Sequence, residues 1–468
     1  MIKKHNFFWY GLSFSIKSII PLVSLPWFSK FLSLEEFGIF ALSIFFGTFI
    51  SGISNLGLLN VFERNYFEIS EEQRKNFLFS VVIFVFCIIS SSTFIVFLFQ
   101  KSLSILIFRD SAIAEFLIYG LFFTGIKSLN QYFYTYLKNQ KAGKVFSILS
   151  IIESVTNIFI ALILVINLNL GIKGFFLGQT LGSLLVFFFF CLYCFNHGYT
   201  SFNLKLLTQS LKLSLPLTPR IFFAVINTHF DRYMINLLGT LGGVGIYEIG
   251  QKLSNSIFIF MTALQQIFSP NVYKKMFSKN KSEFLSIGKY LTPFFFMCVL
   301  FAMPIALFSK EILFLFFPEE FQYGAPVISI LSVLYIVYFF GKQPQLMYAK
   351  RTGLISLLTF FSIFLNVSLN IPFIYTYGYL GAAWATLISG IISTSLNLYY
   401  GQKYTPIKYE RKMIIILIYF VFVVLLNLMQ QNLIKDNLTQ IVIKLISILI
   451  LIFMGLYFKI FKKINLLK

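Results

Sequence analysis

The sequence predicts an all-α integral membrane protein with about 14 transmembrane helices, and three observations support this prediction. Of its 468 residues, 58% are hydrophobic and 12% are charged, whereas in soluble domains roughly half are apolar and about a quarter are charged. Apolar stretches of about 20 residues recur from end to end, the length that crosses a hydrocarbon core. The chain also repeats itself at a nearly constant offset, which indicates two six-helix halves.

The transmembrane helices follow from apolar stretches separated by short polar turns, and the hydrophilic gaps between them are too short to bury a core of their own. The predicted helices cover about 7–30, 37–60, 77–99, 112–137, 145–166, 174–195, 213–238, 243–268, 290–309, 325–348, 353–376, 380–400, 412–430 and 441–460.

The first predicted helix begins like a signal peptide, with Lys3 and Lys4 before an apolar stretch. It then differs from one, because Lys17 interrupts the stretch, Pro21 and Pro26 follow, and no small-residue cleavage site is present. We expect this segment to be retained as a transmembrane helix.

The orientation follows from the basic residues. An even number of helices places both termini on one side, and most of the 38 Lys and Arg residues fall in loops on that side. The positive-inside rule therefore predicts cytoplasmic termini. This distribution also accounts for most of the net charge of +21. Because the basic residues are scattered and do not form one face, nucleic acid is not expected as a partner.

Three pairs of segments reveal the internal repeat. Residues 28–42 resemble 235–249, with Gly38 matching Gly245, and residues 171–185 resemble 378–392, both at an offset of 207. A third pair, 99–110 and 308–319, aligns at an offset of 209. Since each repeat contains six helices, the halves are expected to be parallel repeats around an axis along the membrane normal, with the binding site between them.

This repeat defines the predicted domains. Residues 1–196 form an N-terminal half of six helices, 197–212 a cytoplasmic linker, and 213–402 a second half of six helices. Residues 403–468 add two helices that are apolar on most sides and are expected at the lipid-facing periphery.

Several predicted helices carry a polar stripe with helical spacing, as expected for helices that line a cavity. In 112–137 the stripe comprises Thr124, Lys127, Ser128, Gln131, Thr135 and Lys138, and in 243–268 it comprises Glu248, Gln251, Lys252, Asn255, Thr262 and Gln266.

Cations outnumber carboxylates within the predicted helices, so pairing cannot neutralise all of them, and a functional role is the default for an intramembrane charge. The alternative is structural: Glu248 and Lys252 pair at i, i+4, Asp231 fixes Arg220 or a neighbouring helix, and Lys444 snorkels to the interface. The predicted substrate-binding residues are Lys17, Lys127, Arg220, Arg232, Lys252 and Lys342, and the residues for helix pairing or ion coupling are Glu153, Asp231 and Glu248.

The surplus of positive charge predicts an anionic substrate. Lys and Arg suit phosphate, and the many hydroxyls, amides and tyrosines suit a sugar. A lipid that carries a phosphate-linked glycan combines these features. No metal-ligand spacing surrounds the three His or the four Cys residues, and no nucleotide-binding loop is present. We therefore expect neither a metal nor another cofactor.

Four segments carry a resemblance to a known family: LSLEEFGIFAL from residue 32, DRYMINLLGTLGGVGIYEIGQKLSN from 231, FFPEEFQYGAPVISIL from 316 and GYLGAAWATLISG from 378. With them the chain resembles the bacterial O-antigen (Wzx-type) lipid-linked oligosaccharide flippases. These belong to the MOP superfamily, together with the MATE exporters and the lipid II flippase.

The resemblance implies a flippase that moves a polyprenyl-diphosphate-linked oligosaccharide from the cytoplasmic to the outer leaflet of the bacterial inner membrane. Alternating access would present a cationic central cavity to the headgroup while the polyprenyl tail stays among membrane lipid. Lys17, Lys127, Arg220 and Lys252 stand where such families place their headgroup-binding cations. A monomer is expected, and the residues do not decide whether a proton or sodium ion drives transport.

Two other functions agree less well with the sequence. A cation-coupled multidrug exporter of the same fold would favour carboxylates in its cavity, whereas the embedded charge here is net basic. An envelope enzyme such as a glycan polymerase would need a sizeable outer loop with catalytic groups, and the predicted outer loops are short. We therefore predict a transporter and not an enzyme.

Overall fold

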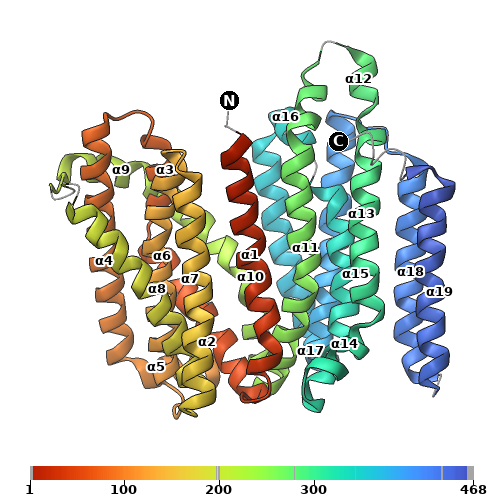
Figure 1. Ribbon diagram of the computed structural model, residues 1–468, viewed down its shortest axis with the longest axis horizontal. Helices are drawn as coiled ribbons and strands as arrows, with labels where there is room; N and C mark the ends of the chain where they lie inside the picture. The colour runs from red at the N-terminus through yellow and green to blue at the C-terminus, as the bar shows by residue number, and fades with distance from the viewer. Residues whose placement is uncertain are drawn as a thin grey trace. The chain divides into compact units, whose positions relative to one another are not determined.

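The computed structural model describes residues 4–196, 198, 201–278, 280–342, 344–433 and 436–460, and within these it contains helices and no strands (Figure 1). Ten of the described helices are long and apolar enough to cross a membrane. The prediction of an all-α, multi-pass membrane protein is thereby confirmed.

Each of the fourteen predicted segments falls on a described helix. The helix α17 (Thr352–Tyr404) covers two of them, 353–376 and 380–400. Its backbone leaves the helical conformation at Gly378, between the two segments. Three others fall on α6 (Glu115–Asn139), α10 (Thr218–Leu238) and α11 (Leu241–Met276). These three carry most of the charged residues predicted for the site, which is why they are less apolar than the other transmembrane helices.

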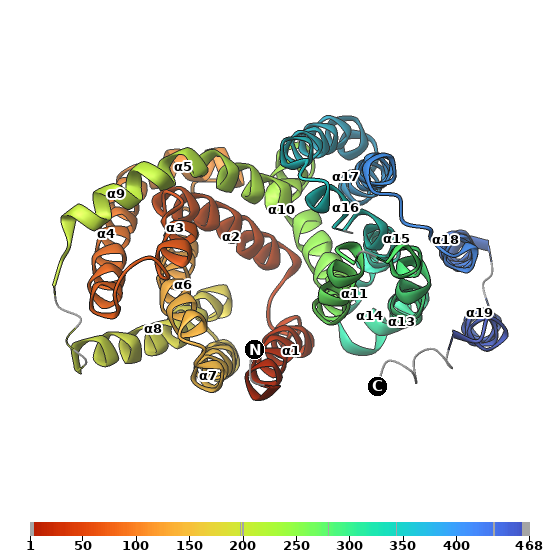
Figure 2. The ribbon, with the colours of Figure 1, turned by 90° about the horizontal axis from the view of Figure 1, so that it is seen from above.

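The contacts divide the chain into two compact units, of which unit 1 comprises residues 1–245. In it α6 packs against α2 and α8, α7 packs against α1 and α8, and α10 packs against α2. The short helix α9 lies across the others and is seen from the side in Figure 2, and its Ser210 hydroxyl accepts a hydrogen bond of 3.2 Å from the Asn65 amide. The remaining helices of unit 1 are α1 (Lys4–Phe28), α2 (Leu34–Ser54), α3 (Leu58–Asn65), α4 (Glu71–Leu98), α5 (Gln100–Phe108), α7 (Gly143–Leu162), the π-helical η1 (Ile163–Asn167), α8 (Gly171–Asn196), α9 (Leu204–Ser214) and η2 (Leu215–Leu217).

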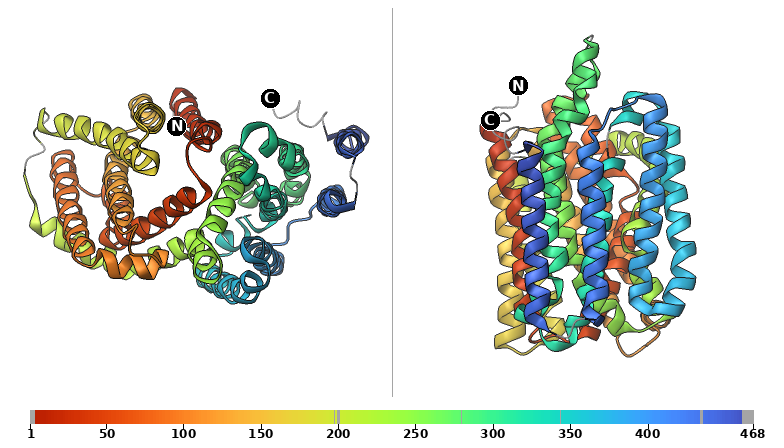
Figure 3. Two further views of the ribbon diagram at one scale, coloured as in Figure 1. Left: turned by 90° about the horizontal axis from the view of Figure 1, so that it is seen from below. Right: turned by 90° about the vertical axis from the view of Figure 1, so that its right-hand side faces the viewer.

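Unit 2 comprises residues 246–468. Its α15 packs against α13 and α17, and α18 packs against α13, α15 and α19 (Figure 3). Besides α11 and α17 its helices are α12 (Lys281–Leu285), α13 (Ile287–Leu307), α14 (Ser309–Phe316), η3 (Glu319–Gly324), α15 (Ala325–Gly341), α16 (Gln345–Tyr348), α18 (Arg411–Leu433) and α19 (Asn437–Tyr457).

The division at Gly245 falls later than the predicted linker 197–212. The reason lies in α10, the first helix of the predicted second half, which packs against α2 and so groups with unit 1. The boundary between the units defined by packing therefore differs from the boundary between the repeats defined by the order of the helices.

The first pair of repeated glycines makes one reciprocal contact within unit 1. A Cβ on Gly38 would overlap the backbone of Leu241, and a Cβ on Gly245 would overlap the backbone of Leu34. Since Leu34 and Leu241 are also 207 residues apart, the first turns of α2 and α11 contact each other in the same way from both sides. The matching glycines of the two repeated segments thus meet the same steric demand.

The glycines of the second pair also adopt the same backbone conformation in each repeat. Gly171 and Gly378 both have positive φ, 52° and 58°, a conformation that glycine adopts without strain. Three residues later, Gly174 and Gly381 lie so close to the preceding helical turns that a Cβ would meet backbone atoms. The shared offset therefore reflects a shared fold of each half.

The added helices α18 and α19 are tied to unit 2 by buried polar contacts. The Lys444 ammonium on α19 lies 2.5 Å from the Glu311 carboxylate on α14, and the lysine side chain is only 2% exposed. The expectation that Lys444 snorkels to the interface is therefore wrong, because a carboxylate partner within unit 2 makes burial possible. Asn427 on α18 also donates to the Leu307 carbonyl at 3.3 Å.

Candidate functional site

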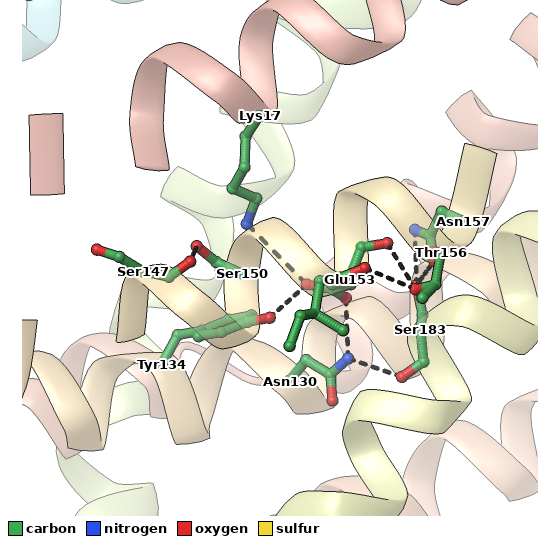
Figure 4. A network of polar contacts seen from close by, with 10 residues as sticks. Lys17, Asn130, Tyr134, Ser147, Ser150, Glu153, Thr156, Asn157 and Ser183 are labelled. Carbon is green, nitrogen blue, oxygen red and sulfur yellow. Dashed lines mark hydrogen bonds and ion pairs between the residues drawn. The ribbon is translucent and has the colours of Figure 1, made fainter. Parts of the chain in front are cut away.

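A buried polar network in unit 1 surrounds Glu153 on α7 (Figure 4). The residue is 5% exposed. Its carboxylate accepts a hydrogen bond of 2.6 Å from the Tyr134 hydroxyl and one of 2.9 Å from the Asn130 amide, both on α6. A buried carboxylate needs such donors, because its desolvation is otherwise costly.

The same network reaches α8. Asn130 also donates to the Ser183 carbonyl at 3.0 Å, and the Asn157 amide donates to the Ser183 hydroxyl at 3.1 Å. Gly182 permits this approach, because a Cβ there would overlap Asn157. Three helices are thus held in register around one carboxylate.

Lys17 enters the network from α1. Its ammonium lies 4.0 Å from the Glu153 carboxylate, with the lysine side chain 33% exposed, and 4.9 Å from the centroid of the Tyr134 ring. The helix α1 is fixed nearby by the Ser147 hydroxyl, which donates to the Trp9 carbonyl at 2.7 Å. Because the carboxylate already accepts two stronger hydrogen bonds, Lys17 is held only loosely.

Lys127 lies on α6 and is exposed. Its ammonium lies 5.4 Å from the centroid of the Phe123 ring, and it is near enough to Lys17 for the two charges to repel. Within the described part of the chain, Lys127 has no carboxylate partner. Unit 1 therefore brings together Lys17, Lys127 and Glu153, with two cations for one carboxylate.

The carboxylate of unit 2 is arranged differently. Glu248 and Lys252 form an ion pair of 3.2 Å within α11, with side chains 7% and 31% exposed. The i, i+4 pairing predicted from the sequence is confirmed. Lys342, at the end of α15, places its ammonium 3.5 Å from the centroid of the Phe258 ring, a cation–π contact.

The remaining predicted residues lie on α10. Asp231 and Arg232 are both buried, and the Arg232 guanidinium donates to the Thr228 carbonyl at 2.7 Å. The side chain of Arg220 lies outside the described residues. The helix α10 thus carries two adjacent buried residues of opposite charge.

The family of the chain follows from a comparison with known sequences. A family model described as polysaccharide biosynthesis protein matches residues 4–270. The chain belongs to this family. The matched segment holds the whole Glu153 network of the polysaccharide biosynthesis protein, together with the Glu248–Lys252 pair.

Individual relatives agree with this assignment. The probable low-salt glycan biosynthesis flippase Agl15 of Haloferax volcanii is 28% identical over 186 residues, which cover 38% of this chain and 39% of that protein. The chain therefore matches only about two fifths of the length of this relative.

Solved structures show the same fold. The lipid II flippase MurJ in an inward closed conformation superposes with a TM-score of 0.72 at 18% identity, covering 96% of this chain and 98% of MurJ. An inward-facing multidrug resistance MATE transporter of the MOP superfamily gives a TM-score of 0.60 at 15% identity, with coverages of 84% and 94%. The predicted resemblance to this superfamily is confirmed.

The sequence-based prediction missed part of the site. Asn130, Tyr134, Asn157 and Ser183 were not predicted as site residues, although they complete the network around Glu153. On α6 the predicted stripe is largely the outward face, with Lys127, Gln131 and Lys138 exposed. The i, i+4 spacing of Asn130 and Tyr134 is the signal for a second, inward polar face.

Proposed function

We propose that this chain is a flippase that moves a polyprenyl-diphosphate-linked oligosaccharide from the cytoplasmic to the outer leaflet of the bacterial inner membrane. It would work by alternating access through a cationic central cavity, with both termini in the cytoplasm, and it would act as a monomer. The family of the chain and the names of its relatives support this class of cargo. Transport of this kind needs no covalent step.

One observation carries the proposal: around Glu153 in unit 1 there are two lysines for one carboxylate. Glu153 accepts its hydrogen bonds from the neutral donors Tyr134 and Asn130. Lys17 lies 4.0 Å away and is therefore not held in a close ion pair. Lys127 adds a second charge on the neighbouring helix. Two adjacent lysines with spare charge suit the two phosphates of a diphosphate.

We propose that the six predicted cations bind the headgroup, and that they contribute unequally to its binding. Lys17, Lys127 and Lys342 have no short ion pair among the described residues. Lys17 and Lys127 would bind the diphosphate most strongly, and Lys342 would contact the glycan part of the headgroup. Lys252 is restrained by Glu248 and would contribute less. Arg220 and Arg232 stay as predicted contacts on α10.

We assign Glu153 to helix pairing and not to ion coupling. Its carboxylate is enclosed by donors from α6 and bonded through Asn130 to α8, which leaves little room for a coordinated ion. Export of the negative headgroup needs no ion on this residue, because a membrane potential favours it by about 2.3 kcal/mol per charge per 100 mV. Asp231 and Glu248 keep both proposed roles.

Transport in proteoliposomes tests this function. The purified protein is reconstituted, and translocation of a fluorescent undecaprenyl-diphosphate disaccharide is followed by its accessibility to an external glycosidase. We expect protein-dependent translocation of this lipid, and at least tenfold slower movement of a neutral glycolipid with the same disaccharide. Equal rates for both lipids, or no rate above empty liposomes, would contradict the proposal.

A further inference from the structure

A polar pocket lies entirely within unit 2, at the ends of α11, α15 and α17 and beside α16. Its volume is about 250 Å³. Lys274, Lys275, Lys350 and Lys403 lie in the same end segments of the chain, so this is the end that the positive-inside rule assigns to the cytoplasm. The polar groups of the pocket come from Gln265, Ser269, Tyr273, Lys342, Gln345 and Asn397.

The pocket wall is fixed by internal hydrogen bonds. Gln345 is 2% exposed, and its amide donates to the Thr405 carbonyl at 2.6 Å. Gly401 makes room for this side chain, because a Cβ there would lie 2.8 Å from the Gln345 amide oxygen. The Gln265 amide donates to the Lys342 carbonyl at 3.2 Å. The pocket is therefore preformed, as small-molecule sites usually are.

Several polar groups of the wall remain available to a ligand. Among the described residues, the hydroxyls of Ser269 and Tyr273 have no hydrogen-bond partner. Asn397 uses its amide nitrogen on the Ser393 carbonyl at 2.9 Å, which leaves its oxygen as an acceptor. Phe340, Leu346 and Met347 supply apolar surface. Such a mixture of amides, hydroxyls and apolar surface suits a sugar ring.

The charge of the pocket limits the charge of its ligand. Lys342 is the one charged residue among the described lining residues, and its flexible side chain rests its ammonium on the Phe258 ring. A diphosphate would require more positive charge or several backbone donors. A single carboxylate matches a single ammonium. The volume also lies below the roughly 300 Å³ at which sites for drug-sized ligands begin, so one monosaccharide is a better fit than an oligosaccharide.

We propose that this pocket binds one acidic monosaccharide, a sugar of the uronic acid class, within the glycan that the chain transports. This rests on the proposed function, because the glycan supplies the sugar. Lys342 would swing from the Phe258 ring to the carboxylate, while Tyr273, Ser269 and Asn397 would contact the ring hydroxyls. The site would thus select glycans by their sugar and not by their diphosphate.

Calorimetric titration of the full chain in lipid nanodiscs tests this inference, with methyl β-D-glucuronide and methyl β-D-glucoside as probes. We expect the glucuronide to bind at least tenfold more tightly than the glucoside. Lys342→Gln should remove this difference, whereas Lys342→Arg should keep most of it. Tyr273→Phe should weaken both sugars by a similar factor, because it removes only a neutral hydroxyl.

Lys403→Gln serves as the matched control, since Lys403 is exposed on α17 and does not line the pocket. It should bind both sugars as the unaltered protein does. Equal affinities for the two sugars, no saturable binding, or an unchanged glucuronide affinity in Lys342→Gln would overturn the inference.

The binding experiment and the transport experiment can fail independently of each other. If a diphosphate lipid with a neutral disaccharide is translocated but the glucuronide does not bind, the sugar site is wrong and the flippase stands. If the glucuronide binds but no lipid is translocated, the proposed function is wrong and the sugar site stands.

Discussion

Unit 1 and unit 2 each bury a glutamate beside a lysine, but they hold the two charges differently. In unit 1 the residues Glu153 and Lys17 come from different helices, 4.0 Å apart, and the carboxylate rests on neutral donors. In unit 2 the residues Glu248 and Lys252 come from one helix and lie 3.2 Å apart. The comparison indicates that a lysine is held more firmly where it forms a close ion pair on its own helix than where the carboxylate takes its hydrogen bonds from neutral donors.

This distinction concerns function as well as stability. A lysine that supports a buried carboxylate cannot move without leaving an uncompensated charge. A lysine beside an already satisfied carboxylate moves at little cost. We therefore expect substitution of the lysine to affect mainly stability in unit 2 and mainly transport in unit 1.

The largest effect on stability should come from removing the unit 1 carboxylate. Glu153→Leu leaves the Tyr134 hydroxyl without its acceptor and removes one of the two acceptors of the Asn130 amide, and each buried donor left unsatisfied costs about 1–3 kcal/mol. Thermal unfolding in detergent should show the loss. Glu153→Gln keeps an acceptor oxygen and should cost about 1 kcal/mol. If Glu153→Leu unfolds at the unaltered temperature, the network does not hold α6 and α7 together.

A smaller effect should distinguish the two lysines. Lys252→Gln removes the ion pair of 3.2 Å from the buried Glu248 and should cost about 2 kcal/mol, less than a fully buried pair because Lys252 is about one third exposed. The double variant Glu248→Gln, Lys252→Gln should recover most of this stability. Lys17→Gln should cost under about 1 kcal/mol, because Glu153 keeps its neutral donors. Equal losses for both lysines in thermal unfolding would remove the contrast between the units.

The smallest effect is expected at an exposed pair. Arg64 and Glu68 lie 2.7 Å apart at i, i+4 with side chains more than half exposed. Glu68→Gln should change the unfolding free energy by about 0.3 kcal/mol. This variant is the reference for the buried pairs. If it changed the unfolding free energy as much as Lys252→Gln does, the distance between the charges, and not their burial, would determine how much these ion pairs stabilise the protein.

Hydrophobic length and charge in the sequence were sufficient to predict the transmembrane helices and the repeat. The glycine pairs at an offset of 207 were recognisable because Gly38 and Gly171 meet local steric demands that recur at Gly245 and Gly378. The Glu248–Lys252 pair was also predictable, because both residues lie on one helix.

Contacts between helices were harder to predict. Glu153 finds its donors on α6, and Lys444 finds Glu311 at a separation of 133 residues, and no local pattern encodes either partner. The packing of α10 against α2 likewise depends on tertiary structure. Periodicity identifies which residues share a face, but it does not identify the helix that faces them.

The most direct test of the central claim compares the lysines of the two units in one transport assay. Translocation of an undecaprenyl-diphosphate disaccharide is measured in proteoliposomes for Lys17→Gln, Lys127→Gln as a double variant, for Lys252→Gln, and for Lys101→Gln, an exposed control on α5. We expect the double variant to lose at least about a hundredfold in rate, about 2.7 kcal/mol in barrier, Lys252→Gln to lose about tenfold or less, and the control to be unchanged. A double variant that transports as well as the control, at equal amounts of folded protein, would contradict the account.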